Sequence, residues 1–309
     1  MIEVENLTKY YGTKQALDKI SFNVKKGVVM GFLGPNGAGK STTMKIITGF
    51  LSPTEGSVKI DGIDIVEQSL EARKRIGYLP EHPPIYLDMT VKNYLEFAAR
   101  IRGIQWKKVK SSVDTVVEKC SLQKYYNAQC HSLSKGYRQR VGIAQALIHE
   151  PMVLILDEPT IGLDPIQIIE IRELIKTFGG EHTVILSTHI LPEVDMTCGE
   201  VIIINDGKVV TQGSTTFLRD GMQNRDQLYL SVRGNASSFG EKLLSIDGVT
   251  DFEMESDENG TFMFRINTGG QLTVSPTIAK AVVEENLDLV ELKSLTPTLE
   301  EIFIKATLN

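Results

Sequence analysis

A glycine-rich turn between an apolar run and a helix-like run constrains this chain more than any other feature. The apolar residues 28–33 lead into the segment GPNGAGKS at residues 34–41, and residues 42–47 have the pattern of a helix. Glycines in such a turn let backbone N–H groups converge on phosphate oxygens, and the helix N-terminus adds positive potential. The Lys40 ammonium can reach β- and γ-phosphates, and the Ser41 hydroxyl can ligate Mg²⁺. The residues expected to hold a nucleoside triphosphate are Gly34, Asn36, Gly37, Ala38, Gly39, Lys40, Ser41 and Thr42.

A second apolar run, residues 154–156, ends in the paired carboxylates of Asp157 and Glu158. Ligands of open α/β sheets bind at the carboxyl ends of the strands. Asp157 is therefore expected to hold Mg²⁺, and Glu158 to polarise or deprotonate the attacking water. A solvated strand end has the same pattern, but its combination with the glycine-rich turn favours the catalytic interpretation.

Short apolar runs alternate with helical segments over the first two-thirds of the chain. The runs at residues 28–33, 153–156 and 184–186 have no polar interruption, which is typical of parallel strands buried on both faces. Residues 90–147 contain no comparable run and have a helical pattern. We predict an α/β fold with a mixed, mainly parallel sheet and a helical subdomain at about residues 88–147.

The pattern changes near Gly221, and we predict a domain at residues 1–220 and a second at 221–309. Asn259-Gly260 between two alternating runs is a strong hairpin signal. The order of predicted elements is βαββαβ, which is that of a small ferredoxin-like α+β domain. The predicted elements are strands at 228–232, 249–255, 261–266 and 289–292, helices at 239–244 and 277–284, and a last helix starting at Thr296-Pro297.

Composition excludes several classes of protein. The chain has 33 basic and 39 acidic residues, a net charge of −6 and a pI near 5.5, which provides no basic field for nucleic acid. The three cysteines have no C-x-x-C spacing, so reduced thiols in a cytoplasmic protein are expected. No secretory signal opens the sequence, and no apolar run approaches the length of a membrane span. We therefore expect a soluble chain that binds no nucleic acid.

Three further motifs occur in a characteristic order: LSKGYRQR at residues 133–140, GLDP at 162–165 and STH at 187–189. Together with the glycine-rich turn and the acidic strand end, they resemble the ATP-binding subunits of ABC transporters over residues 1 to about 220. The segment YLPE at residues 78–81, the LSKGY signature and the small C-terminal domain are similar to those of type-2 ABC exporters.

This resemblance implies a P-loop NTPase core that binds ATP and Mg²⁺ and hydrolyses ATP. It implies transmembrane permease subunits as partners, and a second copy or a related ATPase subunit in a head-to-tail dimer that ATP closes and hydrolysis opens. The chain would then lie peripherally on the cytoplasmic face of the membrane and power export. Two alternatives stay open: a soluble ABC-family ATPase acting on ribosomes or DNA, and a nucleotide-binding regulatory module that does not hydrolyse ATP.

The resemblance also assigns roles to single residues. Tyr11 matches the aromatic residue that stacks on adenine, with its neighbour Tyr10 as an alternative. His189 matches the histidine that bonds the γ-phosphate and orients the water with Glu158. Ser134 and Gly136 match the signature that contacts the γ-phosphate held by the opposite protomer.

Asp164 matches the loop that links the two sites across the dimer.

Two positions depart from the usual pattern of the family. Glu81 stands where most members have Gln, and a carboxylate can approach Mg²⁺ or accept from water but cannot donate as an amide does. Glu81 therefore joins Ser41 and Asp157 as a candidate metal ligand. Lys135, in the signature, would either contact phosphate or lie in solvent.

The membrane subunits are expected to dock on a groove near residues 81–100, between the core and the helical subdomain. The apolar residues of this segment are expected to divide about equally between groove and core. They are Ile85, Tyr86, Leu87, Val91 and Tyr94.

Overall fold

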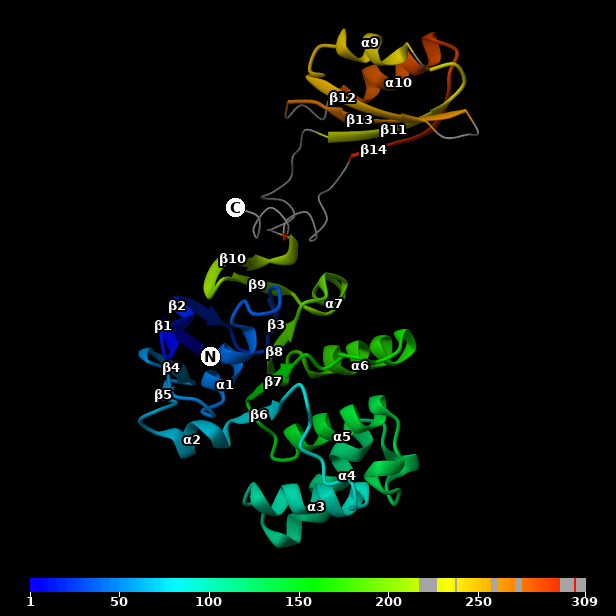
Figure 1. Cartoon of the computed structure of the whole chain (residues 1–309). Coiled ribbons are helices and arrows are strands. Elements are labelled where there is room, and N and C mark those ends of the chain that lie inside the picture. The colour runs from blue at the N-terminus through cyan, green and yellow to red at the C-terminus, as the bar shows by residue number, and fades with distance from the viewer. Residues whose placement is uncertain (217–226, 237, 257–259, 270–273, 295–302, 304–309) are drawn as a thin grey trace. The chain divides into compact units, whose positions relative to one another are not determined.

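The computed structural model describes residues 1–216, 227–236, 238–256, 260–269, 274–294 and 303. Two compact units, Met1–Thr215 and Thr216–Lys305, divide the chain (Figure 1). The boundary predicted near Gly221 and the helix predicted from Thr296 lie outside the described residues. Within the described part of the chain, no helix has the length and apolar character needed to cross a bilayer.

A six-stranded sheet forms the centre of the first unit, in the order β10-β9-β3-β8-β7-β6. Five of its strands run parallel and β10 is antiparallel to β9. The strands β7 and β8 are buried along their whole length, which explains their uninterrupted apolar sequence. This confirms the predicted mainly parallel sheet. The strands are β3 (Val29–Leu33), β6 (Ile76–Leu79), β7 (Val153–Asp157), β8 (Thr183–Thr188), β9 (Glu200–Asn205) and β10 (Lys208–Ser214).

An antiparallel sheet, which the sequence analysis did not predict as a separate element, packs beside α1 (Lys40–Ile47) in the order β2-β1-β4-β5. Its inward residues Ile2, Val4 and Phe22 share one core with Met44 of α1 and Phe32 of β3. This shared core holds the glycine-rich turn, which joins β3 to α1, between the antiparallel sheet and the six-stranded sheet. The strands are β1 (Ile2–Tyr11), β2 (Lys14–Val24), β4 (Glu55–Ile60) and β5 (Ile63–Asp64), and a short helix α2 (Ser69–Lys74) follows β5.

Three helices fill the segment predicted to be helical: α3 (Val91–Ile101), α4 (Trp106–Lys119) and α5 (Lys135–Leu147). They lie together in the lower part of Figure 1. Thr90 caps α3, because its hydroxyl accepts from the Asn93 N–H at 3.2 Å. Short 3₁₀ turns at Gln123–Tyr125 and Cys130–Ser132 connect α4 to α5.

Two further helices of the first unit follow the strands that carry the site. The helix α6 (Pro165–Phe178) follows β7, and α7 (Leu191–Thr197) follows β8. Both begin with a proline in the first turn, where the missing N–H costs no intrahelical bond. The proline therefore marks the start of each helix, and α7 begins soon after β8 ends.

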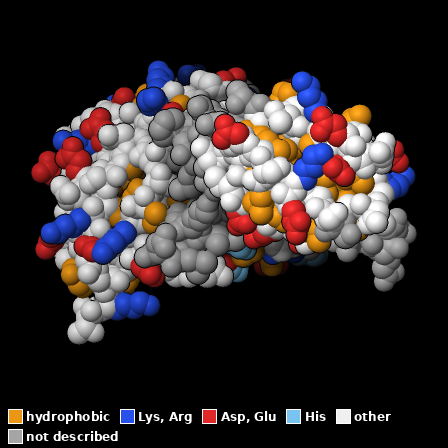
Figure 2. Space-filling view, turned by 90° about the horizontal axis from the view of Figure 1, so that it is seen from above, with side chains coloured by type: hydrophobic (Ala, Val, Ile, Leu, Met, Phe, Trp, Pro, Cys, Tyr) orange, Lys and Arg blue, Asp and Glu red, His pale blue; other side chains and the backbone are white. Residues whose placement is uncertain are grey.

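The second unit has the predicted βαββαβ order and an antiparallel sheet in the order β12-β13-β11-β14. Its two helices cover one face of that sheet (Figure 1), and Leu230, Phe264 and Ile278 form part of its own core. On the face shown in Figure 2, acidic and basic side chains are interspersed. The elements are β11 (Gln227–Arg233), α9 (Phe239–Leu244), β12 (Asp251–Ser256), β13 (Thr261–Asn267), α10 (Ser275–Glu284) and β14 (Asp288–Ser294).

Candidate nucleotide site

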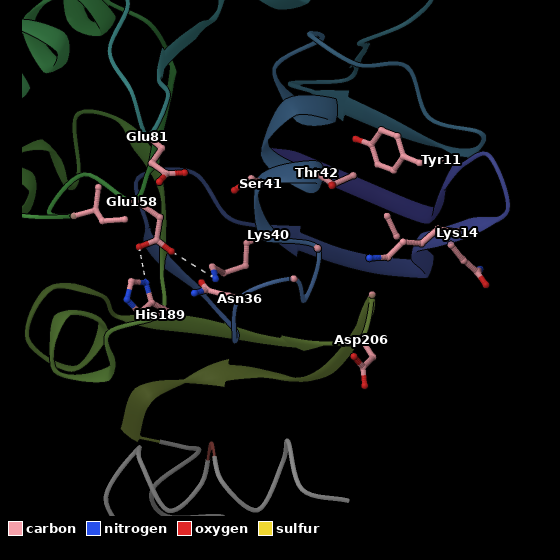
Figure 3. A pocket seen from close by; sticks show the side chains of 16 residues that line it. Tyr11, Lys14, Asn36, Lys40, Ser41, Thr42, Glu81, Glu158, His189 and Asp206 are labelled. Atoms are coloured by element: carbon pink, nitrogen blue, oxygen red, sulfur yellow. Dashed lines mark hydrogen bonds and ion pairs between the residues drawn. The ribbon is translucent and has the colours of Figure 1, made fainter.

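A cleft of about 900 Å³ opens where the glycine-rich turn joins β3 to α1, at the carboxyl ends of β3, β7 and β8 (Figure 3). It brings together side chains from segments far apart in the sequence. The lining residues are Tyr11, Lys14, Gln15, Ala16, Asn36, Gly37, Gly39, Lys40, Ser41, Thr42, Glu81, Glu158, Ile161, His189, Asp206 and Gly207.

The turn needs glycine for two separate reasons. Gly37 and Gly39 have φ of +83° and +108°, a region that residues with a side chain rarely adopt. A Cβ on Gly39 would also lie 2.6 Å from Leu17 Cδ2, and a Cβ on Gly34 only 2.4 Å from the Ile204 carbonyl oxygen. The backbone therefore runs close against β2 and β9, and it has the shape of a cradle for an anion.

Lys40 lies inside this turn and is 6% exposed. Its Nζ donates to the carbonyl oxygens of Gly34 at 2.8 Å and Pro35 at 3.2 Å, and lies 3.5 Å from Glu158 Oε1. The ion pair and the two carbonyls offset the cost of burying the ammonium charge. The turn thus holds a positive charge directly beside the carboxylate that follows β7.

Asp157, at the end of β7, is almost fully buried. One of its carboxylate oxygens accepts hydrogen bonds from two hydroxyl groups. Ser187 Oγ donates to Asp157 Oδ1 at 2.7 Å, and Ser41 Oγ donates to the same oxygen at 3.4 Å. Burial raises the pKa of Asp157, the two hydrogen bonds oppose that rise, and the nearby Glu81 carboxylate adds to it. The predicted pair of Ser41 and Asp157 therefore meets in space, although 116 residues separate the two in the sequence.

Glu158 and His189 form a hydrogen-bonded pair: His189 Nδ1 lies 2.9 Å from Glu158 Oε2 (Figure 3). An ionised carboxylate only accepts, so Nδ1 is the donor, and in the neutral ring Nε2 is then an acceptor. Glu158 has a φ of +50°, and such backbone strain persists only where the surrounding structure holds it. The two residues predicted to act on water are thus in direct contact.

The end of β1 and the start of β2 form the opposite wall of the cleft. Tyr11 is 49% exposed and lines the cleft, whereas Tyr10 is not among the lining residues. Lys9 Nζ lies 5.7 Å from the centre of the Tyr11 ring, a distance at which a cation and an aromatic face attract. Of the two alternatives that the sequence analysis left open, the structure places Tyr11 at the site.

Several lining residues were missed by the sequence analysis: Lys14, Gln15, Ala16, Ile161, Asp206 and Gly207. The sequence Asp206-Gly207 is typical of a hairpin turn. Its position at the cleft, however, results from tertiary packing. The Gly207 N–H donates to the Ala38 carbonyl at 3.0 Å, and the Asp18 N–H donates to the Gly207 carbonyl at 2.8 Å. The β9–β10 hairpin is thereby bonded both to the glycine-rich turn and to β2.

Ser134, Gly136 and Asp164 do not line this cleft; instead they gather at the starts of α5 and α6. Ser134 Oγ accepts from the Tyr137 N–H at 3.4 Å, and Asp164 Oδ1 accepts from the Gln167 N–H at 2.9 Å. Gly136 is buried, and a Cβ there would lie 2.7 Å from the Gln167 side chain. The structure thus divides the predicted site residues into two groups.

A smaller hollow of about 340 Å³ adjoins Glu81, which lines both it and the cleft. Within the segment expected to form a docking groove, Val91 and Tyr94 are buried, while Tyr86 and Leu87 are 54% and 48% exposed. The other residues that line the hollow are His82, Pro83, Ile85, Leu87, Lys135, Arg138, Gln139 and Ile161.

Comparison with known proteins supports one family. The family model described as "ABC transporter" matches residues 17–161. The bacitracin transport ATP-binding protein BcrA of Bacillus licheniformis is 34% identical over 307 residues, which cover 99% of this chain and 96% of that protein.

Two solved structures share the fold of the first unit. CbiO1 of Clostridium perfringens, described as part of the ABC transporter complex cbiONQ, has a TM-score of 0.64 and 32% identity, covering 69% of this chain and 88% of that one. The ATP-binding cassette MJ0796, a dimer in a post-hydrolysis state bound to ADP and Pi, has a TM-score of 0.63 and 27% identity, covering 69% and 98%.

Proposed function

We propose a mechanism from the premise that this chain belongs to the ATP-binding proteins of ABC transporters, which couple ATP hydrolysis to transport. The observation that carries it is the contact of His189 with Glu158, 2.9 Å apart, beside the Lys40 ammonium. A base, its hydrogen-bonded partner and a phosphate-binding cation thus stand together at the carboxyl end of the sheet.

ATP binds with its adenine on the exposed Tyr11 ring and its phosphates in the glycine-rich turn. A flat aromatic ring suits a flat base, and the turn at the N-terminus of α1 suits an anion. On binding, the Lys40 ammonium exchanges its carbonyl partners and Glu158 for β- and γ-phosphate oxygens. Glu158 is then free to accept a hydrogen bond from water.

Ser41 and Asp157 are the residues that would hold Mg²⁺. Mg²⁺ prefers oxygen ligands and is commonly bound through one or two carboxylates and the phosphates of the substrate. The Asp157 carboxylate and the Ser41 hydroxyl, already 3.4 Å apart, fit that donor set. Glu81 lines the same cleft and is the third candidate. The ion, when bound, neutralises charge that develops on the phosphates.

Glu158 orients and deprotonates the attacking water, and His189 bonds the γ-phosphate through Nε2, which donates when the ring carries both protons. The hydrogen bond between the two side chains fixes the position of the base, Glu158, relative to the phosphate-binding side chain of His189. Chemistry of this kind depends mostly on positioning and electrostatic stabilisation.

A second chain completes the site. Ser134, Gly136 and Asp164 lie at the starts of α5 and α6 rather than in the cleft, so a head-to-tail pair would place them on the γ-phosphate of the other copy. A nucleotide bridging two chains stabilises the closed pair, and its hydrolysis removes the bridge. The dimeric form of the cassette MJ0796 supports this arrangement.

The motion would drive export through transmembrane permease subunits docked on the hollow beside Glu81. Leu87, which lines this hollow, and its exposed neighbour Tyr86 offer apolar groups that suit such a partner. The similarity to a bacitracin transport protein along almost the whole chain supports a role in export. The chain would lie on the cytoplasmic face of the membrane, held by those subunits.

The Glu158→Gln variant tests this proposal. An amide cannot take the proton of water, so turnover should fall at least about 100-fold, while ATP binding is retained. Hydrolysis by the purified chain is measured by phosphate release, and affinity by titration calorimetry. The matched control is Glu173→Gln, which changes an exposed carboxylate on α6. Turnover equal to that of the wild type would remove Glu158 from the mechanism.

A further inference from the structure

A fully buried carboxylate lies on α7, and no step of the proposed hydrolysis uses it. Glu193 is 0% exposed. Its Oε1 accepts from Thr160 Oγ1 at 2.5 Å, and its Oε2 accepts from Thr188 Oγ1 at 2.7 Å. Arg172 Nη2, from α6, lies 3.5 Å from Oε1. Burying a charge is costly unless it is paired and hydrogen-bonded, and here both requirements are met.

The two threonines belong to the segments that carry the catalytic pair. Thr160 follows Glu158 by two residues on the loop after β7, and Thr188 directly precedes His189 at the end of β8. Both threonines are buried. Thr188 Oγ1 also accepts from the Ile190 N–H at 3.0 Å, which ties the start of α7 to the same group. One carboxylate therefore joins both segments, with one oxygen on each.

We infer that Glu193 is a positioning residue for hydrolysis, which holds the loop of Glu158 and the strand end of His189 at the separation that their hydrogen bond requires. The left-handed backbone at Glu158 needs such support, because that conformation persists only when neighbouring structure fixes it. The inference rests on the roles proposed above for Glu158 and His189. It adds a residue that does not line the cleft.

The first test separates hydrolysis from binding. In Glu193→Ala the three partners lose their common acceptor, and we expect turnover to fall about 10- to 100-fold, the scale of a misplaced catalytic group. The dissociation constant for ATP should change less than about threefold, because the affinity rests on Tyr11, the turn and Lys40. Asp195→Ala, which removes an exposed carboxylate from the same helix, is the matched control and should keep wild-type turnover.

The second test is a double-mutant cycle with Glu158→Gln. If Glu193 acts by placing Glu158, then Glu193→Ala should change the residual rate of the Glu158→Gln chain less than about twofold. The inference would be overturned if Glu193→Ala lowered the rate of the Glu158→Gln chain by the same factor as it lowers the rate of the wild type. It would also be overturned if Glu193→Ala lowered the melting temperature but left the turnover of each folded molecule unchanged. Wild-type turnover in Glu158→Gln itself would instead refute the proposed function.

A milder series applies if the alanine variant does not fold. Thr160→Val and Thr188→Val each remove one hydroxyl with little change of volume, and each should lower turnover without a matching loss of ATP affinity. Glu193→Gln keeps one acceptor oxygen and should retain more turnover than either Glu193→Ala or the Thr160→Val, Thr188→Val double variant. Wild-type turnover in all three threonine variants would contradict the positioning role.

Discussion

At the scale of single residues, the cleft works through pairs of groups drawn from different segments. Lys40 meets Glu158, Ser41 meets Asp157, and His189 meets Glu158. In each pair one partner ends or directly follows a buried strand of the central sheet. The aromatic wall differs, because Tyr11 ends β1 at the turn into β2 and is half exposed.

Tyr11→Ala should weaken ATP binding about 5- to 150-fold, since stacking of a base on an aromatic ring contributes about 1–3 kcal/mol. Because a ring reads no base edge, the loss should be similar for GTP. Calorimetric titration of both nucleotides measures this. Tyr10→Ala is the neighbouring control and should bind normally; the reverse ranking would assign the stacking role to Tyr10.

At the scale of elements, the site depends on where helices begin and on how their ends join the sheet. Ser134 and Asp164 cap α5 and α6 with their own side chains. At the other end of α5, His149 lies between the helix and β6, with Nε2 3.1 Å from the Ile76 carbonyl oxygen. Burial, helped by the Arg102 charge, lowers the pKa of His149 to about 4.

This lowered pKa predicts a pH dependence of stability. The unfolded pKa is near 6.5, so the unfolded chain takes up the proton first as the pH falls. The contribution of His149 is therefore fully present above about pH 6.5 and is lost between there and pH 4, by up to about 3 kcal/mol. Urea unfolding of wild type and His149→Gln at pH 7 and pH 4.5 measures it. The variant should lose less stability on acidification, whereas the exposed control His131→Gln should follow the wild type.

At the scale of the whole molecule, the first unit separates the predicted site residues into two groups. The cleft has the turn, the carboxylates and His189, while Ser134 and Asp164 lie outside it. Two chains related by a two-fold axis would supply each other with the missing half. The second unit has its own core, and its order of elements indicates a fold but no function.

Mixing two inactive variants tests the shared site. Lys40→Ala removes the phosphate contact of the turn, and Ser134→Asp keeps the helix cap but places a negative charge on the γ-phosphate. Each alone should be inactive. An equal mixture should recover about a quarter of wild-type turnover, because half of the dimers then hold one intact composite site of two. A mixture as inactive as its parts would contradict the shared site, and wild-type turnover of Ser134→Asp on its own would mean that each chain encloses its nucleotide alone.

Much of this protein follows from its sequence because the signals are local. The glycines of residues 34–39, the strand end at Asp157 and the βαββαβ order each depend on a few neighbouring residues, whose backbone freedom and apolar pattern act over short distances. Choosing Tyr11 over Tyr10, placing Asp206 at the cleft and separating Ser134 from it required the tertiary structure. So did the junction at Glu193, which joins Thr160 to Thr188. These contacts arise when layers pack and bring together residues that no sequence spacing relates.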